Sequence, residues 1–108
     1  MALTHVVSFK FKSAVTEAQR QEIYESQLAL ATRCLSAAPE SKPYIHSVVG
    51  GPNLSAEGYD KGNDFAFVMV FNSMQDFNYY DKSDPVHGAF RTRVLPLLED
   101  AFVFDFVA

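Results

Sequence analysis

The chain has 108 residues, of which 48% are hydrophobic and 20% are charged, a balance typical of one globular domain over residues 1–108. No apolar run approaches the roughly 18 residues of a membrane span, and the N-terminus lacks the pattern of a secretory signal, so we expect no membrane partner. The net charge of −4 without a basic patch argues against nucleic acid, and a lone cysteine, Cys34, favours a reducing compartment, which we take to be the cytoplasm.

The first third of the chain predicts a strand followed by a helix. Residues 3–12 alternate between two faces, and one face is apolar apart from His5. Residues 16–19 are typical of a capping box that opens a helix. The helical stripe that follows consists of Tyr24, Gln27, Leu28, Ala31, Cys34 and Leu35. Cys34 lies on this apolar stripe, so we interpret it as a buried structural thiol rather than a nucleophile.

The remainder predicts strands over residues 44–49, 64–71 and 102–107. Gly50 and the residues that follow it are expected to end the first of these strands in a turn, before a polar loop over 54–63. Ser73 is expected to cap a helix, and Asp84 followed by Pro85 restarts that helix after a break. Pro96 is expected to end or kink the restarted helix.

The order of these elements predicts an α+β fold of the ferredoxin-like β-α-β-β-α-β type with a four-stranded antiparallel sheet. The third and fourth predicted strands are apolar on both faces, whereas two helices can cover only one face of such a sheet. We therefore expect a homodimer in which two sheets meet face to face, giving a dimeric α/β barrel.

A few polar residues interrupt the apolar pattern and are candidates for chemistry. His87 follows the helix break, and Tyr79 and Tyr80 precede it. A histidine exchanges a proton near neutral pH, and a tyrosine can hold or polarise an oxygen. His5 and Asp105 lie on the first and last strands, and a buried carboxylate needs a donor, but the pattern alone does not make these strands neighbours. For any one of these residues taken alone, a purely structural role is more common in proteins than a chemical one.

Other classes of site are not indicated. The sequence contains no phosphate-binding glycine motif, no zinc-type spacing of Cys and His, and no serine-nucleophile signature. The loop carboxylates Glu57, Asp60 and Asp64 are expected to be solvated. We therefore expect no metal and no cofactor.

Three segments carry a resemblance to a known family: residues 4–12 (THVVSFKFK), the loop with Gly51-Pro52-Asn53 and Glu57-Gly58-Tyr59, and residues 84–87 (DPVH) through the closing 104–106 (FDF). In these segments the chain resembles the stress-responsive dimeric α/β-barrel (Dabb) family over nearly its whole length. The resemblance implies a ferredoxin-like monomer that pairs through its sheet. One plant member is a cofactor-free polyketide cyclase that performs an intramolecular aldol condensation.

The resemblance also implies roles for individual residues. His87 falls on a general base and Tyr80 on a substrate-positioning tyrosine, with Tyr79 as the alternative because one residue is inserted here. The implied substrate-binding positions are His5, Asp105, Tyr24, Gln27, Phe65 and Phe67. Gln27, Phe65 and Leu98 replace a tyrosine, a histidine and a tryptophan of the plant cyclase, which indicates a different substrate.

Two hypotheses follow. The chain is either a cofactor-independent lyase or cyclase that uses a His/Tyr pair on a small aromatic or polyketide-like molecule, or a non-catalytic stress-responsive homodimeric binding protein. A haem-dependent or oxygen-using relative is a weaker third reading, for which His5, His46 or His87 would be the ligand. The first two are separated by whether His87, Tyr80 and His5 share a cavity.

Overall fold

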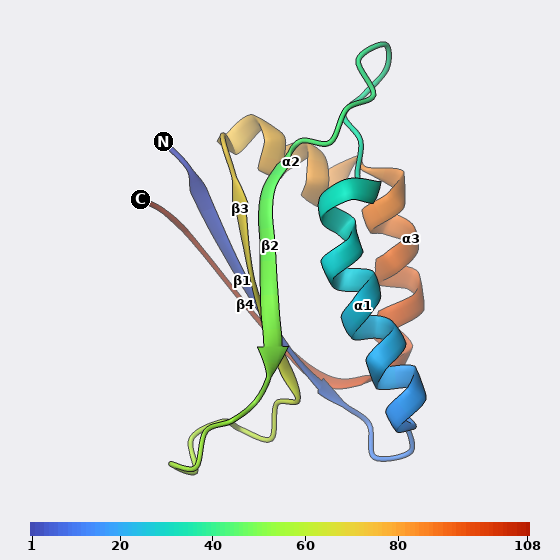
Figure 1. Ribbon diagram of the computed structural model, residues 1–108, viewed down its shortest axis with the longest axis vertical. Coiled ribbons are helices and arrows are strands. Elements are labelled where there is room, and N and C mark those ends of the chain that lie inside the picture. The colour runs from blue at the N-terminus through green and yellow to red at the C-terminus, as the bar shows by residue number, and fades with distance from the viewer.

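A four-stranded antiparallel sheet carries all of the helices on one of its faces (Figure 1). The computed structural model describes all 108 residues. The elements follow in the order β1 (Leu3–Phe11), α1 (Glu17–Arg33), β2 (Ile45–Pro52), β3 (Phe65–Phe71), α2 (Met74–Lys82), α3 (Pro85–Val94), a 3₁₀ turn η1 (Leu95–Leu97) and β4 (Leu98–Val107). The strand order β2-β3-β1-β4 confirms the predicted ferredoxin-like α+β fold, with α2 and α3 in the place of one long helix.

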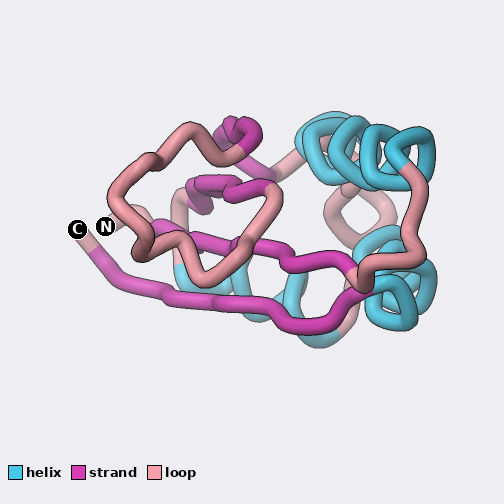
Figure 2. The backbone as a smooth tube through the Cα atoms, turned by 90° about the horizontal axis from the view of Figure 1, so that it is seen from below, coloured by secondary structure: helices cyan, strands magenta, loops and turns pink.

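The helices and the sheet form two layers. The helices α1 and α3 lie side by side, as Figures 1 and 2 show from two directions, and the strands form the other layer. Both chain termini lie at the same end of the sheet, where Ala108 N donates to Ala2 O at 3.2 Å. No helix has the length and apolar character needed to cross a membrane.

Each predicted helix start is a capped helix start in the structure. Thr16 and Gln19 form the reciprocal capping box of α1, and the Ser73 hydroxyl accepts from Asp76 N at the start of α2. Asp84 caps α3 by accepting from Val86 N at 2.9 Å, and Pro85 occupies the first helical position. These caps satisfy backbone donors that a helix leaves free, so they fix where each helix begins.

Two predicted strand boundaries are wrong. Strand β2 continues to Pro52 instead of ending at Val49, because Gly50 lets its backbone pass over the ring of Phe67. A Cβ at Gly50 would lie 2.4 Å from Phe67 Cδ1. Strand β4 begins at Leu98 instead of residue 102, because η1 turns the chain directly into a pairing with Phe11.

The buried stripe of α1 is partly as predicted. Gln27 and Cys34 are buried, but Ile23 and Leu30 complete the stripe, while Leu35 is 40% exposed. The helix ends at Arg33, so Leu35 lies beyond the helical spacing that would bury it. Cys34 is fully buried, and burial together with the nearby Asp84 carboxylate raises the pKa of its thiol to about 12. The prediction that this thiol is buried is thereby confirmed.

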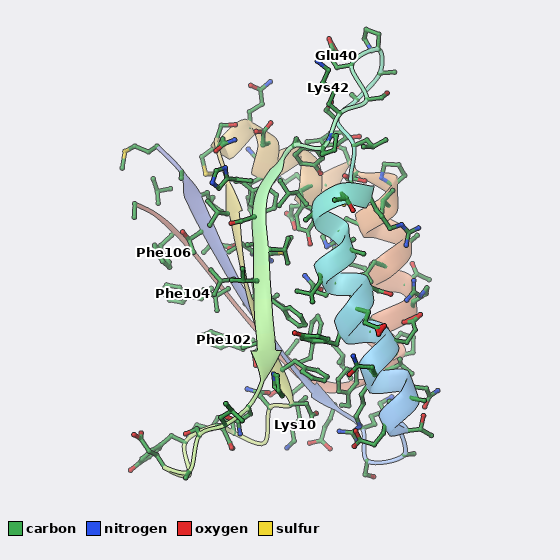
Figure 3. All side chains as sticks on the ribbon, in the orientation of Figure 1. Lys10, Glu40, Lys42, Phe102, Phe104 and Phe106 are labelled. Atoms are coloured by element: carbon green, nitrogen blue, oxygen red, sulfur yellow. The ribbon has the colours of Figure 1, made fainter.

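The face of the sheet without helices is apolar and uncovered. Phe102, Phe104 and Phe106 of β4 point away from the helices (Figure 3). Their exposed fractions are 52%, 56% and 44%, and they pair across the sheet with Ser8, Val6 and Thr4. Val68 of β3 and Val49 of β2 lie farther along the same face, on the other side of β1, and add to this surface, which we call the open face. An apolar surface of this kind marks an interaction site in folded proteins.

Candidate functional site

A cavity of about 200 Å³, partly open to solvent, lies between the helices α2 and α3 and the strands β1 and β4. Most of its wall is apolar, with Val7 and Phe9 on the sheet and Phe90 and Val94 on α3. Its polar lining consists of His5, Gln27, Tyr80, Asp81, His87 and Arg91. An apolar cavity with a few convergent polar groups is the usual form of a small-molecule site.

His87 and Tyr80 meet at the break between α2 and α3. Their rings are stacked, with centroids 3.7 Å apart and planes 11° from parallel. The His87 Nδ1 lies 2.7 Å from the backbone carbonyl oxygen of Tyr80. A carbonyl oxygen only accepts, so Nδ1 carries the hydrogen of the bond, and in the neutral ring Nε2 is the nitrogen with the free lone pair.

The surroundings of His87 favour its neutral form. Burial lowers the pKa of the imidazole below its ordinary value of 6.5, and the nearby Arg91 and His5 act in the same direction. The Tyr80 carbonyl and the Asp81 carboxylate act in the opposite direction but do not outweigh burial. A neutral imidazole with Nε2 unprotonated is the form that can act as a general base.

Tyr80, and not Tyr79, is the tyrosine beside His87. Tyr80 is buried, and burial raises the pKa of its hydroxyl, so the group stays protonated and remains a hydrogen-bond donor. Its hydroxyl lies 3.6 Å from Met69 Sδ. Tyr79 is turned elsewhere, with its hydroxyl donating to Leu35 O at 3.3 Å and its ring against Tyr44.

His5 and Asp105 are direct partners. Strand β1 lies between β3 and β4, and His5 pairs in register with Asp105. The Asp105 carboxylate hydrogen-bonds His5 Nδ1, and the side chains are 11% and 34% exposed for His5 and Asp105. The His5 ring centroid lies 6.1 Å from that of Tyr80, so the Asp105–His5 pair reaches the cavity through His5.

Of the other four positions implied by the resemblance, one lines the cavity and three lie outside it. Gln27 lines the cavity and donates from Nε2 to Met69 Sδ at 3.2 Å. Tyr24 of α1 packs against Phe65 and Phe67 of β3, and none of these three residues lines the cavity. Tyr24 packs on Phe65 and Phe67 at centroid distances of 5.0 and 5.7 Å, and its hydroxyl donates to Gly50 O at 3.0 Å.

Two charged residues of the cavity were not singled out from the sequence. Arg91 follows His87 by one helical turn on α3, and Asp81 follows Tyr80 directly on α2. The spacing of four residues between His87 and Arg91 is a signal that the sequence does contain, because such residues share one helix face. No group of three or more His, Cys, Asp or Glu side chains is arranged to hold a metal ion.

Comparison with protein families matches residues 3–108 to the Stress responsive A/B Barrel Domain (Dabb). Olivetolic acid cyclase from Cannabis sativa is 24% identical over 106 residues, which cover 98% of this chain and 96% of that protein.

Solved structures give the same picture of the fold. Hydroxynitrile lyase from Passiflora edulis matches with a TM-score of 0.84 and 21% identity, covering 99% of this chain and 93% of that one. A dimeric ferredoxin-like protein of unknown function from Thermobifida fusca matches with a TM-score of 0.77 and 22% identity, covering 100% and 92%. At these identities, the structural likeness establishes the fold alone.

Proposed function

Because the chain belongs to the stress-responsive A/B barrel (Dabb) family, we propose that it is a cofactor-independent lyase or cyclase. In this proposal His87 is the general base that acts on a small carbonyl compound in the cavity. The observation that carries the proposal is the hydrogen bond from His87 Nδ1 to the Tyr80 carbonyl, which leaves Nε2 as the basic nitrogen in a mostly apolar cavity.

The proposed chemistry begins with a proton on a carbon next to a carbonyl group. His87 Nε2 takes this proton, and the electron pair of the C–H bond moves onto the carbonyl oxygen, which becomes an enolate oxygen. Tyr80 stabilises that oxygen by donating a hydrogen bond, and the buried hydroxyl is suited to this because it stays protonated. General base catalysis of this kind contributes about 10²–10⁴-fold to a rate.

The cyclisation step completes the proton balance. The enolate carbon attacks a second carbonyl carbon of the same molecule, forming a C–C bond and an alkoxide. The protonated His87 then returns its proton to the alkoxide, and the ring is regenerated in its neutral form. The Asp105–His5 pair is suited to orienting the polar groups at this end of the cavity, since His5 lies beside Tyr80.

The substrate in this proposal is small and largely apolar. A cavity of about 200 Å³ with Val7, Phe9 and Phe90 in its wall suits an aromatic or short polyketide-like molecule. The names of two relatives, a cyclase and a hydroxynitrile lyase, support the reaction class. The single buried cysteine is compatible with action in the cytoplasm.

The test is proton exchange at carbon, because it does not require knowledge of the natural substrate. Exchange of the methyl protons of acetophenone in D₂O is followed by NMR with wild type, His87→Ala and His46→Ala. His46 is an exposed histidine on β2, so it is a matched control. We expect wild type and His46→Ala to accelerate exchange above buffer and His87→Ala to lose most of that acceleration. Equal rates for His87→Ala and wild type would refute the role of His87.

We further propose that two copies of the chain pair through the open face. Three half-exposed phenylalanines in a row on β4, together with Val68 and Val49 farther along the same face, form an apolar surface that a second copy would bury. The dimeric relative from Thermobifida fusca supports the pairing.

Changing one central residue of the open face tests the dimer. Phe104→Lys places a charge in the middle of the proposed interface, whereas Met74→Lys places one on an exposed position of α2. Light scattering after size-exclusion chromatography should give the mass of two chains for wild type and Met74→Lys and of one chain for Phe104→Lys. A wild type that stays monomeric at all concentrations contradicts the pairing. A dimer without any His87-dependent exchange favours the non-catalytic homodimeric alternative.

A further inference from the structure

Arg91 is a cation at the cavity whose guanidinium group has no carboxylate partner. Its one hydrogen bond runs from Nη1 to the backbone oxygen of Asp81 at 3.2 Å, and no ion pair engages it. By contrast, Arg20 contacts Asp64 at 2.9 Å and Arg93 contacts Glu22 at 2.7 Å. A guanidinium carries five N–H donors, so most of those of Arg91 are free for a ligand.

Arg91 lies close to His87, the proposed base, on the same helix. His87 and Arg91 are four residues apart on α3 and both line the cavity. Residues at this spacing lie on one helix face with their Cβ atoms roughly 5–6 Å apart. Arg91 also contributes to the lowered pKa of His87, which places its charge within reach of that ring. A ligand that contacts both side chains has an anionic group a few bonds from the carbon that loses its proton.

We infer that Arg91 binds a carboxylate of the substrate, so that the cavity prefers a keto acid, aliphatic or aromatic, over a neutral carbonyl compound of the same size. This inference rests on the proposed function of the same cavity. The planar fork of an arginine matches the two oxygens of a carboxylate, and the apolar remainder of the cavity receives the body of the molecule. Arg91 is thus a specificity-determining residue, and His87 remains the base.

Asp81 is the charge that opposes such binding. It lines the same cavity, and its carboxylate repels an anion. Asp81 offers Arg91 its backbone oxygen but not its side chain, so the guanidinium is held in place without being neutralised. The two residues together set how strongly the site prefers an anion over a neutral molecule of equal size.

The test compares two isosteric probes, 2-naphthoate and 2-naphthamide, which differ in charge. Their dissociation constants are measured by fluorescence titration with wild type, Arg91→Gln and Arg33→Gln, and NMR shifts of the His87 ring report binding in the cavity. Arg33 is an exposed arginine at the end of α1 that has no ion pair and lies outside the cavity, so it is the matched control. We expect wild type and Arg33→Gln to prefer the naphthoate about five- to ten-fold, and Arg91→Gln to lose this preference. Asp81→Asn should increase the preference for 2-naphthoate, because it removes a negative charge from the cavity.

The possible results distinguish carboxylate binding by Arg91 from the proposed role of the cavity itself. Suppose that both probes shift the NMR signals of the His87 ring, with the same affinity in wild type and in Arg91→Gln. The cavity is then a binding site, but the role of Arg91 is overturned. If Arg91→Gln weakens both probes equally, the residue acts on the shape of the cavity and the inference is again overturned. If neither probe reaches His87 in the wild type, the inference falls together with the proposed cavity.

Discussion

The helix-covered face of the sheet has two halves that differ in how they are filled. Over β2 and β3, the rings of Tyr24, Phe65 and Phe67 pack against one another beneath α1, and we call this the filled half. Over β1 and β4, the cavity separates the sheet from α2 and α3, and we call this the hollow half. Large apolar side chains thus supply the stability on one side, so that the other side can keep a cavity whose mostly apolar wall includes a few polar side chains.

One truncation in each half tests whether the two halves differ in stability. Phe67→Ala in the filled half should lower the free energy of unfolding by about 3–5 kcal/mol, because Phe67 is fully buried and its removal leaves a void. Val103→Ala in the hollow half should change it by only about 0.5 kcal/mol, since Val103 is half exposed at the cavity wall. Urea denaturation measures both, and equal losses would contradict the division into halves.

In the hollow half, the hydrogen-bonded pair of Asp105 and His5 is expected to contribute to stability, as ring packing does in the filled half. Asp105→Asn removes the charge that accepts from His5 Nδ1, and we expect a loss of about 1–2 kcal/mol of unfolding free energy. Asp100→Asn alters an exposed carboxylate on the same strand and should stay within about 0.5 kcal/mol of wild type. A loss from Asp105→Asn no larger than that from Asp100→Asn would mean that the pair is not a stabilising contact.

The lowered pKa of His87 makes the stability of the hollow half depend on pH. Its pKa is lowered by burial and by Arg91, so in the window below 6.5 the unfolded chain binds a proton that the folded chain resists. The contribution of His87 to stability is therefore fully present above pH 6.5, and it declines as the pH falls from there through the lowered pKa of the folded protein.

NMR titration of the histidine ring signals measures this lowering of the pKa. The midpoint of His87 should lie below 6.5 in wild type, and it should move up in Arg91→Gln because a positive neighbour is removed. His5, Asp81 and the Tyr80 carbonyl also act on this ring and stay unchanged in the variant. A wild-type midpoint at or above 6.5 would show that the ring is not held in its neutral form.

In the filled half, we expect the loss of the Tyr24 hydroxyl to change the free energy of unfolding only slightly. Tyr24→Phe keeps the ring that packs on Phe65 and Phe67 and removes only the hydroxyl that donates to Gly50 O. We expect a loss of about 0.5–1 kcal/mol of unfolding free energy, which is the net contribution of one hydrogen bond. Tyr24→Ala should cost several times more, and similar losses from both variants would mean that the ring contributes little.

Much of the fold could be predicted because its signals are local. The caps at Thr16, Ser73 and Asp84 are specified by neighbouring residues, and the alternation of β1 and β3 is visible within each strand. The length of β2 could not be predicted in this way. Its continuation depends on Gly50 meeting Phe67, which lies on another strand.

The candidate site was predictable in its members but not in its contacts. His87, Tyr80, His5 and Asp105 stand out as polar residues in apolar surroundings, yet their meeting depends on the order of strands in the sheet. The choice between Tyr79 and Tyr80 depends on the turn from α2 into α3, which a residue count does not give. The spacing of four residues places Arg91 on the same helix face as His87, but an exposed arginine late in a helix is common, and only the cavity beside it gives that spacing a role.

The burial of Cys34 has a consequence for how the protein withstands oxidants. Oxidation and alkylation of cysteine proceed through the thiolate, and a thiol with a pKa of about 12 that is closed off from solvent supplies almost none. The chain contains no other cysteine. Peroxide or maleimide reagents should therefore leave the folded protein without a modified thiol until it unfolds, so the rate of labelling at Cys34 reports directly on opening of the core.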